Sequence, residues 1–329
     1  MIISSASCRL SFGSCDHSPI AERFGGVALN AAINKRIYIF IRKRSHLERL
    51  KYRISYSKTE LCETRSDIKH PIVREAIRMV NIKDPLEIIY AADVPSRLGL
   101  STSSAMATAL LKGLWYYKGT SISNDILAEM VYNLERVKLG EQGGYQDSYA
   151  TSFGGISYLT GHPGCVRREA IKLSPEKADE FKNHLMLIYT GNQELSYKIL
   201  KEQLDKLSKG ETLNETLKIK RLVQEMYATI VQPDFKPMDL SYAMKEAWEL
   251  KKKLSSTMTS PQIAEIEDKI NKICPSAGYR LIGAGGGRGF ILILTPPEYK
   301  EFLKDALLPL KSFEFDFDWD GAKVREING

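Results

Sequence analysis

The segment at residues 86–117, LEIIYAADVPSRLGLSTSSAMATALLKGLWYY, does most to limit the folds that this chain can adopt. It reads as a strand, a loop and a helix, because Pro95 stops the strand and Gly99 permits a turn before a run of hydroxyl residues. We expect the helix to begin within residues 101–104. Its first turn would present unpaired N–H groups at the positive end of the helix dipole, which suits phosphate oxygens. The same residues also fit a capped helix that binds no ligand, and the chain contains no GxxxxGK[ST] sequence of the Walker type.

A second glycine-rich run, GAGGGRGF, lies between strand-like segments at residues 279–282 and 290–294. A dinucleotide-binding reading fails, because no helix follows the glycines and Arg288 occupies the sixth position of the GxGxxG pattern. The run therefore indicates a glycine turn that brings the backbone close to a neighbouring loop or to a ligand.

Near residue 165 the strand-and-loop patterns give way to long, charged amphipathic helices. At 329 residues the chain is long enough for two domains. We expect one domain at 1–165 and a second at 166–329. Mixed α+β architecture, with two layers in each half, is the simplest arrangement. The predicted strands are 27–33, 36–42, 53–57, 86–91, 184–189, 279–282 and 290–294, and the predicted helices are 103–117, 124–138, 194–209, 213–231, 240–256 and 260–273.

Charge and cysteine content exclude several classes of protein. Lys and Arg outnumber Asp and Glu by 47 to 40, but the basic residues are scattered, which argues against a nucleic-acid surface and favours a mild attraction for anionic substrates. The five cysteines are odd in number and contain no CxxC pair, which indicates neither a disulfide framework nor a zinc site. No apolar run approaches the ~18 residues of a membrane span, and no export signal is evident. We therefore expect a cytoplasmic protein that does not bind membranes.

Two carboxylates and one arginine are candidates for chemistry. Glu135 lies at the edge of a predicted apolar helix stripe that includes Val137, where a carboxylate is commonly a solvated partner of a neighbour such as Lys138. Asp147 lies between two glycine pairs and fits either a turn residue or a base beside a substrate hydroxyl. Arg9 stands among small and apolar residues, so a carboxylate or phosphate partner is expected.

Taken in order, Arg9, PSRLGLSTSSA, Glu135, GGYQDSYATSFGG and GAGGGRGF resemble the pattern of the GHMP (galactokinase, homoserine kinase, mevalonate kinase, phosphomevalonate kinase) kinases. Within that superfamily the chain is similar to bacterial D-glycero-D-manno-heptose 7-phosphate kinases in YSKTE, IKHPIVREA, FGGVALNAAI and FDFDWDGAKV. The resemblance implies a domain like ribosomal protein S5 domain 2 followed by a ferredoxin-like domain, with ATP between them. It also implies transfer of phosphate from ATP to the anomeric oxygen of the sugar phosphate, giving the 1,7-bisphosphate used to make nucleotide-activated heptose for surface polysaccharide.

The resemblance also assigns roles to single residues. Asp147 matches the catalytic aspartate, Arg9 matches a basic residue beside it, and Asp16 is the equivalent of a sugar-binding aspartate. Ser103 and Glu135 match the ligands of Mg²⁺. The residues expected around the ATP phosphates are Pro95, Gly99, Leu100, Ser101, Thr102, Ser103 and Ser104. Those expected on the substrate side are Gly285, Gly286, Gly287, Lys58, His70 and Arg74. The three glycines belong to the family's third motif, which also supports the loop around the phosphates. Lys58, His70 and Arg74 could serve the sugar's existing phosphate or form a surface salt-bridge set.

The chain departs from the family pattern in ways that keep alternatives open. GSCDH is shorter than the GGGTD-like stretch of related heptose kinases, Thr102 replaces a common serine, and Arg288 interrupts the glycine run. The shorter segment leaves room for another sugar-1-kinase activity, such as that of a fucokinase. A catalytically inactive ATP- or sugar-binding sensor is a different class of function, which the presence of Ser103, Glu135 and Asp147 disfavours. A structural or nucleic-acid-binding role is weaker still.

Overall fold

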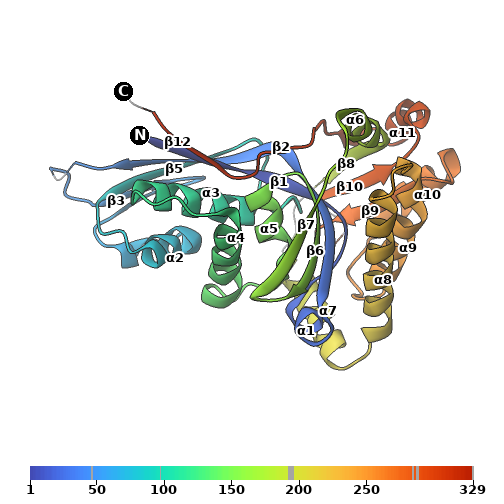
Figure 1. The fold of residues 1–329 in the computed structure, drawn as a ribbon, viewed down its shortest axis with the longest axis horizontal. Coiled ribbons are helices and arrows are strands. Elements are labelled where there is room, and N and C mark those ends of the chain that lie inside the picture. The colour runs from blue at the N-terminus through green and yellow to red at the C-terminus, as the bar shows by residue number, and fades with distance from the viewer. Residues whose placement is uncertain (46, 97, 192–195, 284, 287–288, 328–329) are drawn as a thin grey trace.

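The structure is a computed structural model that describes residues 1–45, 47–96, 98–191, 196–283, 285–286 and 289–327. Within this part of the chain, helices pack on two separate β-sheets (Figure 1). None of the described helices combines the length and apolar character that crossing a membrane requires.

The first sheet is built around two long antiparallel strands, β1 (Ile2–Cys15) and β2 (Gly26–Lys43). Sequence analysis predicted two strands, 27–33 and 36–42, but β2 runs unbroken through both. An irregularity in the pairing with β1 accommodates the polar residues Asn34 and Lys35 between them. Among the described residues the strand order is β12-β1-β2-β5-β3-β4, with β6 pairing β2 and β7. The other strands are β3 (Tyr52–Ser55), β4 (Thr59–Cys62), β5 (Leu86–Ala92), β6 (Ile156–His162), β7 (Cys165–Ile171) and β12 (Lys323–Glu326).

Helices α3 and α5 pack against β1 and β2 and so position the segments that carry the candidate catalytic residues. The predicted helix at 103–117 is confirmed as α3, which begins one residue earlier. The helices of this half are α1 (Ser18–Phe24), α2 (Pro71–Val80), α3 (Thr102–Tyr117), α4 (Asn124–Tyr132) and α5 (Gln146–Phe153), and a π-helical turn, η2 (Asn133–Lys138), extends α4.

The second sheet is antiparallel, in the order β11-β8-β10-β9 over the described residues. Its strands are β8 (Leu185–Gly191), β9 (Gly278–Ile282), β10 (Gly289–Leu294) and β11 (Lys311–Ser312). The surrounding helices are α6 (Pro175–His184), α7 (Ser196–Ser208), α8 (Leu213–Ile230), α9 (Ser241–Lys252), α10 (Pro261–Ile273) and α11 (Lys300–Ala306). The four helices and three strands that apolar periodicity predicts here are confirmed to within a few residues.

The two halves of the chain are not divided at residue 165. That position is the first residue of β7, which pairs with β6, so a boundary there would cut a hairpin of the first sheet. The sheet continues to Ile171, and β12 returns from the other end of the chain to pair with β1. Arg36 of β2 also forms a buried ion pair with Asp318. The change from the first sheet to the second therefore falls between β7 and β8.

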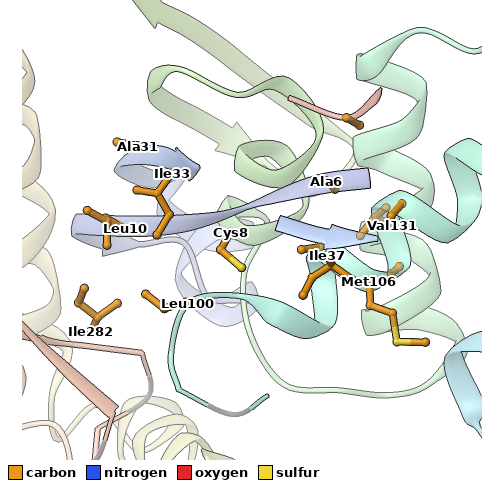
Figure 2. Packing of buried hydrophobic residues seen from close by; sticks show 14 of the residues in the cluster. Ala6, Cys8, Leu10, Ala31, Ile33, Ile37, Leu100, Met106, Val131 and Ile282 are labelled. Carbon is orange, nitrogen blue, oxygen red and sulfur yellow. The ribbon is translucent and has the colours of Figure 1, made fainter. Parts of the chain in front are cut away.

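Buried side chains from both halves form one continuous apolar cluster. Leu100, in the loop between β5 and α3, packs in this cluster with Leu10 of β1 and Ile282 of β9 (Figure 2). Because apolar packing of this kind resists local rearrangement, it fixes the loop after β5 against the second sheet.

Candidate active site

A cavity of about 980 Å³ lies between the two halves. Arg9, Ser101 and Asp147 line it from the first half, and Thr216, Lys251 and Arg280 line it from the second. Its volume is at the upper end of the range of small-molecule sites, so the cavity has room for more than a single small ligand.

The loop before α3 forms one wall of this cavity. Ser101 adopts a left-handed conformation with φ of 60°, and α3 begins at Thr102, as the sequence predicts. A residue other than glycine in that conformation is strained, and such strain is concentrated at functional sites. Of the residues expected around the ATP phosphates, Pro95, Gly99, Ser101, Thr102 and Ser103 line the cavity, whereas Leu100 and Ser104 are buried behind it.

Arg9 connects the loop to the candidate catalytic carboxylate. Its Nε donates a hydrogen bond to Oδ1 of Asp147 at 2.8 Å, and its Nη1 donates to the carbonyl of Gly99 at 2.7 Å. Only 4% of Arg9 is exposed. The prediction that this guanidinium needs a carboxylate partner is confirmed, and the partner is the residue expected to act in catalysis.

Asp147 lies in the first turn of α5 rather than in an open turn. Burial alone would raise the pKa of its carboxyl group, but the positive charges of Arg9 and Arg136 outweigh that effect, and the pKa lies below its ordinary value. Asp147 is therefore ionised at neutral pH and can accept a hydrogen bond or a proton from a ligand in the cavity.

Glu135 is buried instead of solvated. Only 1% of it is exposed, whereas 63% of Val137, predicted to be buried, is exposed. The π-helical turn η2 causes this difference, because its wider turn rotates the following residues away from the face expected of an α-helix. Ser104 Oγ donates to Glu135 Oε2 at 2.7 Å, and the cation beside it is Arg136, at 3.9 Å, in place of the expected Lys138.

These residues fit a magnesium ion. The second carboxylate oxygen of Glu135, Oε1, is buried without a hydrogen-bond partner among the described residues, and oxygen donors are the ligands that Mg²⁺ prefers. Ser103 is exposed at the cavity wall, and the hydroxyl that contacts Glu135 belongs to its neighbour Ser104. Glu135 and Ser103 remain the predicted ligands, and Ser104 orients the carboxylate.

Deprotonation of Glu135 should lower the free energy of unfolding as pH rises. Burial, only partly offset by Arg136 and Ser104, raises its pKa from 4.5 to about 7. The folded protein therefore binds this proton more tightly than the unfolded chain, so stability is lost between about pH 4.5 and 7. Glu135→Gln removes this loss and should stabilise the protein by about 2–3 kcal/mol at pH 8 relative to wild type. Urea unfolding of both proteins at pH 5 and pH 8 measures the effect, and parallel pH dependences would contradict it.

The structure brings some of the predicted substrate residues to the cavity and not others. Asp16 is buried and does not line the cavity, although its neighbours Cys15 and His17 do. Its carboxylate accepts a hydrogen bond from the backbone N–H of Gln146 at 2.7 Å, and burial raises its pKa to about 6. His70 lines the cavity. Lys58 is exposed outside the cavity, and Arg74 donates to the carbonyl of Ile68 and pairs with a neighbouring glutamate, which is the surface alternative.

The glycine run after β9 approaches the loop between β5 and α3, but through different glycines from those expected. A Cβ atom on Gly283 would lie 2.7 Å from Gly99 Cα, and one on Gly289 would lie 2.8 Å from the carbonyl oxygen of Leu98. Gly285 and Gly286 instead contact Met258 and do not line the cavity. Gly287 lies outside the described residues.

The sequence analysis missed several charged or polar residues at this site, and four of them bear on the charge of the cavity. His17, Arg136, Lys251 and Arg280 all line the cavity. Arg280 carries the same signal as Arg9, a basic residue within an apolar strand, and could have been found. Lys251 follows no such signal, because it lies in a lysine run on a helix that reads as a solvated face.

Residues 71–155 match the family model of the GHMP kinases N terminal domain. The chain carries a GHMP kinase N-terminal domain. The matched residues include α2, the phosphate loop, Glu135 and Asp147. A solved structure described as a D-glycero-D-manno-heptose 1-phosphate kinase from Bacteroides thetaiotaomicron superposes with a TM-score of 0.81 over 100% of both chains, at 23% identity. The predicted two-domain α+β GHMP kinase fold is therefore confirmed.

Two curated relatives are named for kinases of different sugars. The D-glycero-alpha-D-manno-heptose 7-phosphate kinase of Campylobacter jejuni is 25% identical over 97% of this chain and 96% of its own length. The bifunctional fucokinase/GDP-fucose pyrophosphorylase of Arabidopsis thaliana is 30% identical over 62% of this chain, but the match spans only 19% of that protein.

Proposed function

We propose that this protein is an ATP-dependent sugar kinase whose acceptor is a heptose 7-phosphate, D-glycero-D-manno-heptose 7-phosphate, phosphorylated at the anomeric oxygen. The observation that carries the proposal is the Arg9–Asp147 pair, which holds an ionised carboxylate beside the loop at the start of α3. The similarity to the Campylobacter jejuni kinase over almost the full length of both proteins supports this choice of acceptor.

In this mechanism the chain contributes mainly position and charge, which is what phosphoryl transfer requires. The N–H groups at the start of α3 bind the terminal phosphates of ATP, and Arg9 stabilises the charge that develops on the transferring group. Asp147 accepts the proton of the anomeric hydroxyl as that oxygen bonds to the γ-phosphorus. The bond from this phosphorus to the β–γ bridging oxygen breaks at the same time, and ADP leaves. A magnesium ion held by Glu135 and Ser103 would neutralise phosphate charge.

The first experiment is a measurement of ADP release with Mg-ATP and a panel of sugars. The panel contains D-glycero-D-manno-heptose 7-phosphate, its unphosphorylated parent, mannose, galactose and fucose, and the phosphorylated position is read by phosphorus NMR. We expect turnover on the heptose phosphate with a new anomeric phosphate. Binding of ATP without turnover on any member would contradict the proposal and favour a sensor.

A fucokinase is the second candidate, because two relatives with fucokinase activity in their names, from Arabidopsis thaliana and Bacteroides fragilis, match this chain at 30% and 26% identity. Each match covers about a fifth of the relative, 19% and 22%. Faster turnover on fucose than on the heptose phosphate in the same panel would favour it.

A further inference from the structure

Arg280 is a buried guanidinium that has no counter-ion in the part of the chain that the structure describes. It lies in β9 between Tyr279 and Leu281, it is 4% exposed, and it lines the cavity. Among the described residues, its Nε has no hydrogen-bond partner, and no carboxylate lies within ion-pair distance of it. A buried charge in this condition is costly, so a ligand of opposite charge is expected to complete it.

Lys251 of α9 adds a second positive charge to the same wall. Its Nζ donates to the carbonyl of Gly283 at 2.7 Å, and it faces Arg280, Arg9, Asp16 and Asp147. Burial, and then the nearby Arg280, lower its pKa well below the ordinary value. Burial, and then Arg9, lower the pKa of Arg280 to about 9. An anion bound between the two groups would stabilise the charged form of each.

Arg280 approaches β1 at a different residue from Arg9, which pairs with Asp147. Its Nη1 would lie 3.5 Å from a Cβ atom on Gly13, four residues along β1 from Arg9. At a strand rise of ~3.3 Å per residue, these two points on β1 are about 13 Å apart. Arg9 is already neutralised by Asp147, whereas Arg280 is not. A sugar with its anomeric oxygen at Asp147 would therefore direct its far end toward Arg280.

We propose that Arg280, with Lys251, binds a phosphate group that the acceptor already carries. This inference rests on the proposed function and deepens it, because it makes this enzyme a kinase of sugar phosphates and disfavours unphosphorylated sugars such as fucose. The guanidinium fork matches two phosphate oxygens, and the lysine ammonium supplies a point charge beside it. The subsite replaces the predicted one at Lys58, His70 and Arg74.

The test compares D-glycero-D-manno-heptose 7-phosphate with the unphosphorylated heptose. Their binding is measured by calorimetry in the presence of Mg²⁺ and a non-hydrolysable ATP analogue, so that turnover is not needed. Arg280→Gln should weaken binding of the 7-phosphate by about 10- to 100-fold, the usual effect of losing a charged hydrogen bond. Arg280→Lys should lose less, because it keeps the charge. Lys272→Gln on the exposed face of α10 is the control for charge removal alone.

The outcomes separate this inference from the proposed function. Equal losses for the heptose and its 7-phosphate, or an unchanged affinity for the 7-phosphate, would overturn the subsite. Arg280-dependent binding of the 7-phosphate in a protein that phosphorylates neither sugar would support the subsite and contradict the proposed activity. Thermal unfolding of each variant without ligand checks that the fold is intact.

Discussion

Asp147→Asn should reduce phosphoryl transfer by about 10²–10⁴-fold, the usual range for removal of a catalytic acid or base. The amide cannot accept the proton of the anomeric hydroxyl, but it is similar in size to the carboxylate and its oxygen can still accept the hydrogen bond from Arg9 Nε. We therefore expect folding and ATP affinity to be retained. Single-turnover kinetics measures the transfer step, and equilibrium titration measures ATP binding.

Asp179→Asn is a matched control, because it removes a carboxylate from the exposed face of α6 away from the cavity. It should leave kcat and KM unchanged. Wild-type turnover by Asp147→Asn would remove this residue from the catalytic role. A large loss of stability in the same variant would instead indicate that the carboxylate mainly neutralises the buried Arg9.

Gly99→Ala should destabilise the protein by about 2–5 kcal/mol, from the cost of a left-handed alanine plus overpacking. Gly99 has a φ of 80°, and a Cβ atom there would lie 2.5 Å from the carbonyl oxygen of Ile282. Backbone from the second sheet cannot move away without separating the loop from β9. Denaturant unfolding measures the stability, and ATP affinity should fall with it because the loop is displaced.

Gly119→Ala isolates the contact from the backbone conformation. Gly119 has nearly the same φ, 79°, but a Cβ atom on it would meet nothing within 4 Å. It should therefore lose only the conformational part, about 1–2 kcal/mol. Equal losses in the two variants would show that the close approach between the loop and the second sheet contributes nothing.

Local sequence patterns predict part of this fold and part of the site. Helices α7 to α10 follow from apolar periodicity, whereas α6 and α11 were not predicted, and Arg9 follows from the cost of an unpaired guanidinium in an apolar strand. The burial of Glu135 could not be predicted, because the α-helical period fails at the π-helical turn. Lys251 and Arg280 come to the cavity from a helix and a strand far apart in sequence from Asp147, and no local pattern records that meeting.

The pairing of β12 with β1 has a consequence for the order in which the chain can fold during synthesis. The ribosome makes β1 before the second domain and β12 after it, so the sheet that carries Arg9 is complete only after the second domain has emerged. Until then the outer edge of β1 presents unpaired N–H and C=O groups to the solvent. The nascent chain therefore depends on β12 to protect this edge of β1, and a chain truncated before β12 is the form most exposed to aggregation.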